Sequence, residues 1–366
     1  MSNLNQFLDN NRDYHNIEFF PTSGTFTAKK TGWHRVCVLG GGGSGGAACG
    51  ATNARATGGS GGGFAWDEIF LVKGATVTVT IGSGGAAVAR AATGASAGNN
   101  GGNTVFGTYM TVYGGLGGAA NQGVTTAIAA TNYGTTPIGG GLGNYVGGGA
   151  GGISHAKVGF WVTGGGSSGS FKGNGYPSGT ISGGASPSAT GGAGVGGKSG
   201  DVILNDYLFT SGGGSHGPSS DNANAEGGAD YIGRKSTTDG VYASGSQDVV
   251  TIGVFKNGIM SGFGVTTGSY IPLSINPLLS LDSSGQGVGS TLNGSGNGAG
   301  TGAVNYPSPT TNSRAGACGG SGAASTTGTG GVASQAGIGA GGGASVGASG
   351  TATSSKGGDG FVTVEY

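Results

Sequence analysis

Short runs in which apolar and polar residues alternate are spread along this chain, and each predicts a β-strand. The clearest run is 77–81, where Val77, Val79 and Ile81 share one face and two threonines share the other. Four segments of this kind border a run of glycines, and we expect them to form one antiparallel β unit: Trp33–Leu39, Phe64–Ile81, Thr104–Tyr113 and Phe361–Tyr366. The C-terminus would then return to the N-terminal region.

Turn signals predict three hairpins within and beyond this unit. They connect 64–72 with 76–81, 202–204 with 207–209, and 249–256 with 259–265, the last around Asn257-Gly258. No segment after residue 24 shows the 3.6-residue period of an amphipathic helix. The sequence therefore predicts an all-β or irregular fold with essentially no α-helix after residue 24.

Runs of glycine separate the predicted strands. Glycine makes up 93 of the 366 residues, where ordinary usage of about 7% would give roughly 26. The first glycine is Gly24, and the runs that follow include 40–46, 58–63, 147–152 and 337–343. Whatever structure these runs adopt decides the architecture of the protein.

Three structures could accommodate glycine runs. Flexible linkers between such short strands would leave no compact protein, and collagen needs glycine at every third position with abundant proline. Extended threefold helices of the polyglycine II type fit better, because without a Cβ their backbones can pack side by side and hydrogen-bond to one another. Proline would remove a needed donor and is absent from the runs. A branched side chain at Gly149 or Gly342 should therefore disrupt the packing.

Charged residues are few and balanced. Fifteen basic and fifteen acidic side chains give a formal net charge of zero, so we expect no nucleic-acid partner. We find no signal peptide and no run approaching 18 apolar residues, so we expect synthesis in the host cytoplasm and no membrane insertion. Three cysteines (Cys37, Cys49 and Cys318) without a C-x-x-C pair are typical of a chain that no disulfide stabilises.

Two stretches spell nucleotide-binding motifs. Residues 40–45 match the dinucleotide fingerprint, and Gly192–Ser199 match the P-loop. Both motifs work because a following helix points its N–H groups at a phosphate. Here 47–63 are rich in Gly, Ala and Thr, and 202–204 predict a strand. We therefore expect no nucleotide binding and no cofactor.

The other patterns that resemble catalytic or metal motifs are weak too. Residues 42–46 and 58–62 spell G-x-S-x-G, but that motif also needs a following helix. The four histidines share no metal-ligand spacing, and acidic residues are sparse. The sequence predicts a protein that is not an enzyme and holds no metal.

Residues 25–46 resemble the opening of the glycine-rich domain in bacteriophage tail-fibre proteins. The resemblance rests on Thr25-Phe26-Thr27 and on Thr31-Gly32-Trp33-His34-Arg35-Val36-Cys37-Val38-Leu39 followed by glycines 40–46. Residues 59–64, 101–107 and 357–366 fit the same pattern, so it covers about residues 24–366. The alternation of glycine runs with variable segments is similar to the receptor-binding adhesins at the tips of T-even-type long tail fibres.

This resemblance implies a small antiparallel β-sandwich joined to a stack of polyglycine II helices, with variable loops that touch the bacterial surface. We accordingly expect an N-terminal attachment segment at 1–23 and a β-rich domain at 24–120, completed by strand 361–366. Residues 121–360 would form the polyglycine II region, with a strand-rich insert at about 229–292. That insert, and an N-terminal segment of only about 23 residues, depart from the T-even adhesins.

The sequence predicts an adhesin whose loops recognise a receptor. The segments 128–146, 153–163, 170–181 and 303–315 are longer than the ~2–5 residues that a turn needs. They place aromatic rings among small polar residues, which is typical of binding loops. The candidate receptor-binding residues are Tyr133, Tyr145, Phe160, Trp161, Phe171, Tyr176 and Tyr306. Alternatively, these aromatic residues cap the ends of the glycine stack.

The expected partners are a bacterial surface receptor, either an outer-membrane protein or a glycan, and other tail-fibre or tail proteins. Residues 1–23 would bind the latter and place the chain in the virion, at a tail fibre or tail tip. Because net charge is near zero, receptor binding should depend little on salt. A purely structural tail component and an ice-binding protein are the alternatives.

Overall fold

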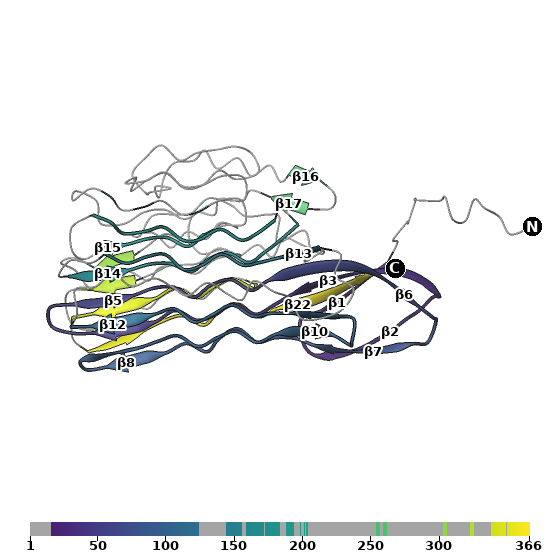
Figure 1. Ribbon diagram of the computed structural model, residues 1–366, viewed down its shortest axis with the longest axis horizontal. Helices are drawn as coiled ribbons and strands as arrows, with labels where there is room; N and C mark the ends of the chain where they lie inside the picture. The colour runs from purple at the N-terminus through teal and green to yellow at the C-terminus, as the bar shows by residue number, and fades with distance from the viewer. Residues whose placement is uncertain are drawn as a thin grey trace, which may run out of the picture.

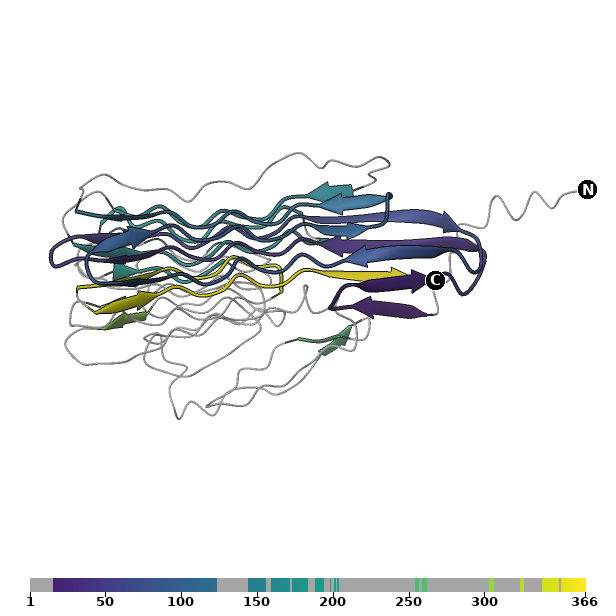
Figure 2. The ribbon, with the colours of Figure 1, turned by 90° about the horizontal axis from the view of Figure 1, so that it is seen from below.

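The computed structural model describes residues 16–123, 144–155, 159–171, 173–183, 188–193, 198, 201, 203, 254–256, 259–261, 303–305, 323–325, 338–348 and 350–366. These residues form an elongated molecule (Figures 1 and 2). A β-sandwich lies at one end, extended glycine-rich segments run along the long axis, and short strands lie at the other end. The described part of the chain contains strands and no helix, which confirms the predicted all-β fold.

Two antiparallel sheets form the sandwich. The first has the order β1-β22-β3-β6-β13, with bounds Ile17–Phe20, Phe361–Glu365, Gly32–Leu39, Phe64–Leu71 and Asn144–Val146. The second has the order β11-β10-β7-β2, with bounds Met110–Val112, Thr104–Phe106, Thr76–Thr80 and Gly24–Thr27. Side chains from both sheets, such as Val36 and Val79, share one buried core. The period-2 alternation of the sequence thus marks the faces that meet in this core.

The C-terminal strand occupies the interior of the first sheet. β22 pairs with β3 from Phe361 opposite Leu39 to Glu365 opposite Arg35, and β1 pairs with its other edge. The predicted return of the C-terminus to 33–39 is confirmed. Residues 17–20, which the sequence assigns to an attachment segment, form β1 and therefore belong to the sandwich.

The predicted hairpin of 64–72 with 76–81 is wrong. β6 and β7 lie in different sheets, and the turn at Lys73-Gly74 crosses between them. Both strands have one apolar face, and Ile69 of β6 and Val77 of β7 lie in the same core. Packing the two strands face to face buries both faces, whereas pairing them edge to edge would leave the shared face uncovered.

His34 is a polar residue within this core. It is fully buried, its Nδ1 donates to the Gly32 carbonyl at 3.0 Å, and the rings of Phe26 and Tyr366 lie 5.7 Å from it. Its Nε2 has no hydrogen-bond partner. Burial lowers the pKa of His34, with nearby Lys30 acting in the same direction and the Gly32 hydrogen bond against it.

We expect this histidine to make stability depend on pH. Because the folded pKa of His34 lies below its ordinary value of about 6.5, the unfolded chain binds its proton first as the pH falls. The free energy of unfolding should be highest above about pH 6.5 and should fall between there and the lowered pKa. Thermal unfolding from pH 8 to 5 measures this. In His34→Gln the decrease should be smaller, and an identical pH profile would show that other groups cause it.

Glycine-rich segments between the two ends form a side-by-side stack. All seven amides of segment 40–46 donate to neighbouring carbonyls over 2.8–3.3 Å. Gly40, Gly43 and Gly46 donate to segment 57–63, and the residues between them donate to two other segments. A direction that repeats every third residue is the repeat of a threefold helix. Segment 40–46 is therefore packed as a polyglycine II helix.

Six segments surround this central helix. It donates to 57–63, 97–103 and 354–360, and it accepts from 82–88, 113–119 and 338–345. The six also bond to one another in a closed ring, for example from Gly59 N–H to Gly342 O at 2.9 Å and from Gly357 N–H to Gly85 O at 2.9 Å. Four segments from the predicted domain 24–120 and two from the predicted region 121–360 thus share one hexagonal arrangement.

The stack continues beyond the first ring on one side. Segment 57–63 also bonds to 147–152 and 163–169, and the latter bonds to 174–180 and 190–193. At most interior glycines, a Cβ would fall on a carbonyl of the next helix, as at Gly43 on Leu116 O. The space that a side chain would need therefore holds neighbouring backbone, which explains why glycine recurs.

Some backbone amides in the stack donate to a serine hydroxyl of the neighbouring helix in place of a backbone carbonyl. The Oγ of buried Ser60 accepts from Leu116 N–H at 2.7 Å, and the Oγ of Ser44 accepts from Asn99 N–H at 2.8 Å. Serine is small enough to fit and supplies the acceptor that the amide needs. These serines are thus part of the hydrogen bonding of the stack.

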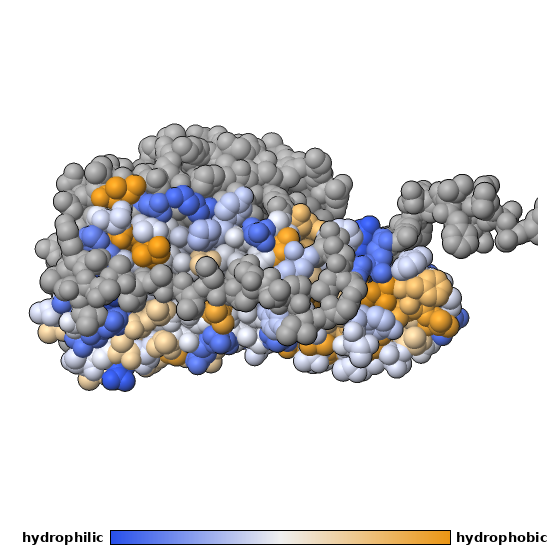
Figure 3. All heavy atoms as spheres, in the orientation of Figure 1, coloured by the Kyte–Doolittle hydropathy of each residue, from blue (hydrophilic) through white to orange (hydrophobic). Residues whose placement is uncertain are grey.

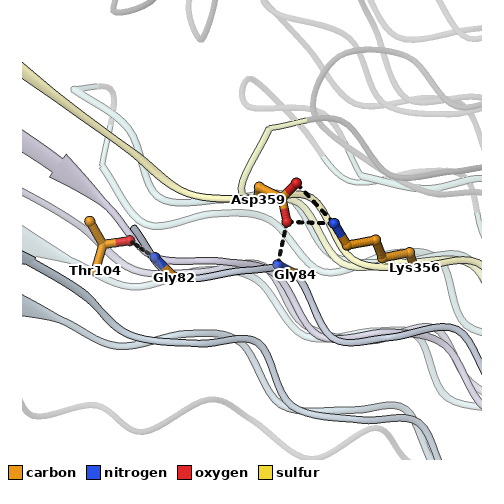
Figure 4. Close-up of polar contacts among 5 residues, drawn as sticks. All are labelled: Gly82, Gly84, Thr104, Lys356 and Asp359. Atoms are coloured by element: carbon orange, nitrogen blue, oxygen red, sulfur yellow. Dashed lines mark hydrogen bonds and ion pairs between the residues drawn. The ribbon is translucent and has the colours of Figure 1, made fainter. Parts of the chain in front are cut away.

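Figure 4 shows two further side chains that accept hydrogen bonds from backbone amides, at the edge of the stack. The Oγ1 of Thr104 accepts from Gly82 N–H at 2.9 Å, and Asp359 accepts from Gly84 N–H at 2.7 Å. Asp359 also pairs with Lys356 Nζ at 2.6 Å. The carboxylate at Asp359 therefore has a hydrogen-bonding role in the stack.

Removing one such acceptor should measurably destabilise the protein. In Ser60→Ala the partly buried Leu116 amide loses its hydroxyl acceptor, which costs about 0.5–1.5 kcal/mol. We expect a lower midpoint of thermal or urea unfolding. Ser83→Ala is the matched control, because Ser83 is exposed. Equal midpoints for the two variants would contradict the role given to the Ser60 hydroxyl.

Short strands close the end of the stack remote from the sandwich. One sheet has the order β12-β5-β14-β15, with bounds Ala120–Gln122, Ala54–Ala56, Phe160–Val162 and Ser188–Ala189. A second has the order β18-β19-β20-β4-β9, with bounds Ala303–Asn305, Ala323–Ser325, Ser345–Gly347, Ala47–Cys49 and Gly94–Ser96. A third pairs β21 (Thr351–Thr353) with β8 (Ala89–Ala91). We call this region the distal end.

A further pair lies apart from these sheets. β16 (Val254–Lys256) pairs antiparallel with β17 (Ile259–Ser261), with Lys256 opposite Ile259. This confirms the predicted hairpin around Asn257-Gly258. The predicted hairpin at 202–209 and the rest of the insert 229–292 lie outside the described residues.

Candidate functional site

The distal end is where segments linking the glycine helices meet solvent. Its exposed positions lie in or next to the short strands and include Ala51, Thr52, Ala91, Ala92, Thr93 and Ile153. Ile153 is the large apolar residue among them, with 45% of its surface exposed. Apart from Ile153 these side chains are small and uncharged, and Arg90 lies beside them with its guanidinium 3.4 Å from Thr93 O. This surface would therefore recognise a partner mainly by shape and neutral hydrogen bonds.

One distal turn carries an unusual backbone conformation. Ala92 has φ of +60°, a left-handed value at which a non-glycine residue is uncommon. Its amide donates to Gly350 O at 3.1 Å, which fixes this turn to the neighbouring one. Exposed residues with strained backbone cluster at functional sites in other proteins, so the 91–94 turn is a candidate contact.

Phe160 and Trp161 do not contribute to this surface. Phe160 is 8% exposed and packs among small apolar residues between two distal sheets, and Trp161 is 2% exposed. The Trp161 ring contacts Ile181 and meets the His155 ring edge-on at 5.0 Å. Because a glycine stack has no side-chain core of its own, large rings from its connecting segments fill its end. Their burial matches the capping alternative, and their role as receptor contacts stays a prediction.

Three other candidates lie toward the sandwich. Tyr145 is in β13 opposite Ala65, and its ring packs against the sandwich core. Phe171 is 51% exposed and meets the Phe64 ring edge-on at 4.8 Å. Tyr176 is 42% exposed on segment 174–180. These residues do not join Phe160 and Trp161 in one site.

The last two candidates, Tyr133 and Tyr306, lie outside the described residues. Their role as receptor contacts stays a prediction. The described candidates thus separate into a buried pair at the distal end and three residues toward the sandwich.

A buried arginine at the distal end was missed by the sequence reasoning. Arg55 in β5 is 1% exposed, and burial lowers its pKa. In register beside it lie Asn121 of β12 and Trp161 of β14. The sequence feature that could have pointed to Arg55 is that it is the one charged residue within 47–63. Its burial makes it part of the distal framework.

The cysteines of the described region are structural. Cys37 and Cys49 are buried and reduced. Burial raises the pKa of both thiols, and the Cys49 thiol donates to Arg90 O at 3.2 Å. A buried thiol with a raised pKa is a poor nucleophile. No group of three or more metal-ligating side chains occurs within the ranges given above.

The motifs that spell nucleotide-binding sites use their amides within the stack. Gly40, Gly42 and Gly45 donate to the carbonyls of Gly63, Gly358 and Ser355. In the stretch that spells a P-loop, Ala193 donates to Gly165 O at 2.9 Å, and Lys198 pairs with Asp201 at 2.8 Å. These described groups are engaged with protein partners. Residues 194–197 and 199 of the P-loop stretch lie outside the described residues, and the absence of nucleotide binding stays a prediction.

Comparison with known proteins identifies the family. A model of the glycine-rich domain family matches residues 21–252, more than half of the chain, so the protein belongs to that family. No curated protein matches the chain. Within the described ranges, no helix has the length and apolar character needed to cross a membrane.

Proposed function

We propose that this glycine-rich domain protein is a receptor-recognition protein of a bacteriophage tail fibre or tail tip. Its distal end would contact a bacterial surface receptor, an outer-membrane protein or a glycan. Its sandwich end would be held by other tail proteins. The resemblance of 24–46 and 357–366 to tail-fibre glycine-rich domains motivates this proposal.

One structural observation carries the proposal. The described chain enters at Asn16 and ends at Tyr366, which bond to each other on the sandwich, while the turns next to β4, β8 and β21 lie at the opposite end of the stack. Backbone hydrogen bonds in several directions make the stack rigid. A rigid support lowers the entropy lost when loops dock, which favours binding.

Binding to cells tests the proposal directly. We expect fluorescently labelled protein to bind a subset of strains in a panel of Gram-negative bacteria, and saturably. Protease treatment of the cells should abolish binding if the receptor is a protein, and periodate treatment should abolish it if the receptor is a glycan. Failure to bind any strain would favour a purely structural tail component.

A matched pair of variants locates the surface. Thr52→Arg, Thr93→Arg and Ile153→Arg together place bulky charges on the distal end, and we expect at least tenfold weaker cell binding. Ser83→Arg, Ala86→Arg and Ala97→Arg together change three exposed small residues on the side of the stack and should leave binding unchanged. Equal binding by the two variants would exclude the described distal turns as the contact.

A separate double variant tests Tyr133 and Tyr306. Aromatic anchors in interfaces are often worth about 2 kcal/mol or more, roughly thirtyfold in affinity. We therefore expect Tyr133→Ala with Tyr306→Ala to weaken cell binding by about this factor. Unchanged binding of the folded double variant would remove them from the receptor site.

A further inference from the structure

The tip of the sandwich farthest from the glycine stack carries exposed aromatic and basic side chains together. We call this tip the sandwich pole and define it by turns 28–31 and 72–75 and by the adjoining Trp33 and Phe70. The two turns are bonded to each other, through Gly74 N–H to Ala28 O at 2.8 Å and Lys73 N–H to Thr31 Oγ1 at 2.9 Å. The pole is therefore a built surface with fixed turns.

Large apolar side chains are exposed on this pole. Trp33 is 45%, Phe70 is 52% and Val72 is 59% exposed. Trp33 and Phe70 are cross-strand partners whose rings meet edge-on at 5.6 Å. Figure 3 shows orange apolar residues adjoining blue hydrophilic ones at this end of the molecule. Sheet faces in a sandwich are usually polar where they meet solvent, so this pair indicates an interaction surface.

Three lysines lie on the turns next to the aromatic pair. Lys29, Lys30 and Lys73 are exposed on the two bonded turns. Lys29 lies 3.8 Å from Glu18, an exposed pair of little energetic weight. Lys30 and Lys73 form no ion pair with any described residue. The pole is therefore positive, although the whole chain has no net charge.

The positive charge ends one row further along the same face. There Arg35 Nη1 lies 3.3 Å from Glu365 Oε2, and Glu68 is the cross-strand partner of Arg35. This row has one cation and two carboxylates, so the positive charge of the pole does not extend into it. The surface thus presents an apolar strip with cations at its outer rim, and a complementary partner would present apolar and acidic residues side by side.

We propose that the sandwich pole docks an acidic segment of a partner protein in which carboxylates alternate with apolar side chains. This inference rests on the proposed function, since it names the surface by which another tail protein, here called the carrier, would hold the sandwich end. Three lysines are too few to favour nucleic acid, where specific binding commonly neutralises about 6–10 phosphates. They are also fewer than the ~4–8 basic residues of membrane-surface clusters.

A peptide probe tests the pole without knowledge of the carrier. The probe is a fluorescein-labelled peptide that alternates glutamate and leucine, and fluorescence anisotropy measures its binding to the full chain. We expect saturable binding that weakens severalfold from about 0.1 M to 1 M NaCl, as the Debye length falls from about 10 Å to about 3 Å. The same peptide with glutamine in place of glutamate should bind at least tenfold more weakly.

Variants separate charge from apolar contact. Lys29→Glu, Lys30→Glu and Lys73→Glu together should weaken probe binding at least tenfold, and the three Lys→Arg substitutions should preserve it. Trp33→Ala with Phe70→Ala should weaken it similarly. Equal binding by all variants, or no binding by the natural sequence, overturns the proposal. So does tighter binding of duplex DNA or phosphatidylglycerol vesicles than of the peptide.

Cell binding distinguishes this inference from the proposed function. The Lys→Glu variant should bind bacteria as well as the natural sequence does, because the receptor surface lies at the distal end. Probe binding without any cell binding would overturn the receptor function and leave the docking surface standing. Cell binding without probe binding would overturn the docking surface and leave the receptor function standing.

Discussion

Replacing both Gly149 and Gly342 with valine should abolish the ordered glycine stack. A Cβ at Gly149 would fall on the Tyr176 carbonyl, and one at Gly342 would fall on the Ser355 carbonyl. Both amides also donate within the stack, to Ser167 O at 2.8 Å and to Gly43 O at 2.7 Å. The neighbouring backbone cannot move away from a branched side chain without breaking these bonds.

The expected loss is a large fraction of total stability. Overpacking usually costs about 1–3 kcal/mol at each site, and here rigid backbone takes the place of adaptable side chains. We expect the unfolding midpoint to fall by on the order of 10 °C or more, or the product to be insoluble. Ala86→Val with Ala97→Val is the control, because both residues are exposed on outer segments and should shift the midpoint by only ~1–2 °C. A fully stable glycine double variant would indicate that these runs are linkers.

Deleting residues 361–366 should have an effect of similar size. β22 lies between β1 and β3, so the deletion removes an interior strand and leaves two unpaired edges. Its Val362 and Val364 are fully buried in the sandwich core. Open edges promote association between chains, and we expect an aggregated product in place of a monodisperse one.

Size-exclusion chromatography with light scattering measures this outcome. A truncation that removes only Tyr366 is the matched control, since it keeps all five residues of β22. It should lose the Asn16 bonds and the Tyr366–Glu18 hydrogen bond but remain soluble. A soluble, monodisperse 361–366 deletion would contradict the interior position of the strand.

The sequence predicted the type of each structural element better than it predicted which elements lie side by side. Alternation at 77–81 and 361–366 indicates strands because one face of each is buried, and the glycine runs indicate helices that pack through their backbones. The pairing of glycine runs is a different problem. Segments 40–46 and 58–63 carry almost the same residues, so side chains give little information on which run lies beside which.

The sequence is least informative where burial depends on the whole fold. The turn at Lys73-Gly74 fits a hairpin locally, but β6 and β7 lie in opposite sheets because each buries its apolar face in the shared core. Phe160 and Trp161 have the flanking residues of binding loops, yet they are buried because the end of a glycine stack lacks other large side chains. A signal was available at Ser44 and Ser60, since a single serine within a glycine run marks an amide that needs a hydroxyl acceptor.

The most direct test of the stack is native-state amide hydrogen exchange across residues 40–46. If six helices surround this segment, all seven of its amides should exchange at least about 10³-fold more slowly than in an unstructured glycine peptide, because exchange then requires opening of the stack. The amide of exposed Asn100 on an outer segment, which donates no hydrogen bond to the backbone of any described residue, should exchange much faster. Exchange of 40–46 within about tenfold of the free-peptide rate would show that this run is a linker and would contradict the hexagonal arrangement.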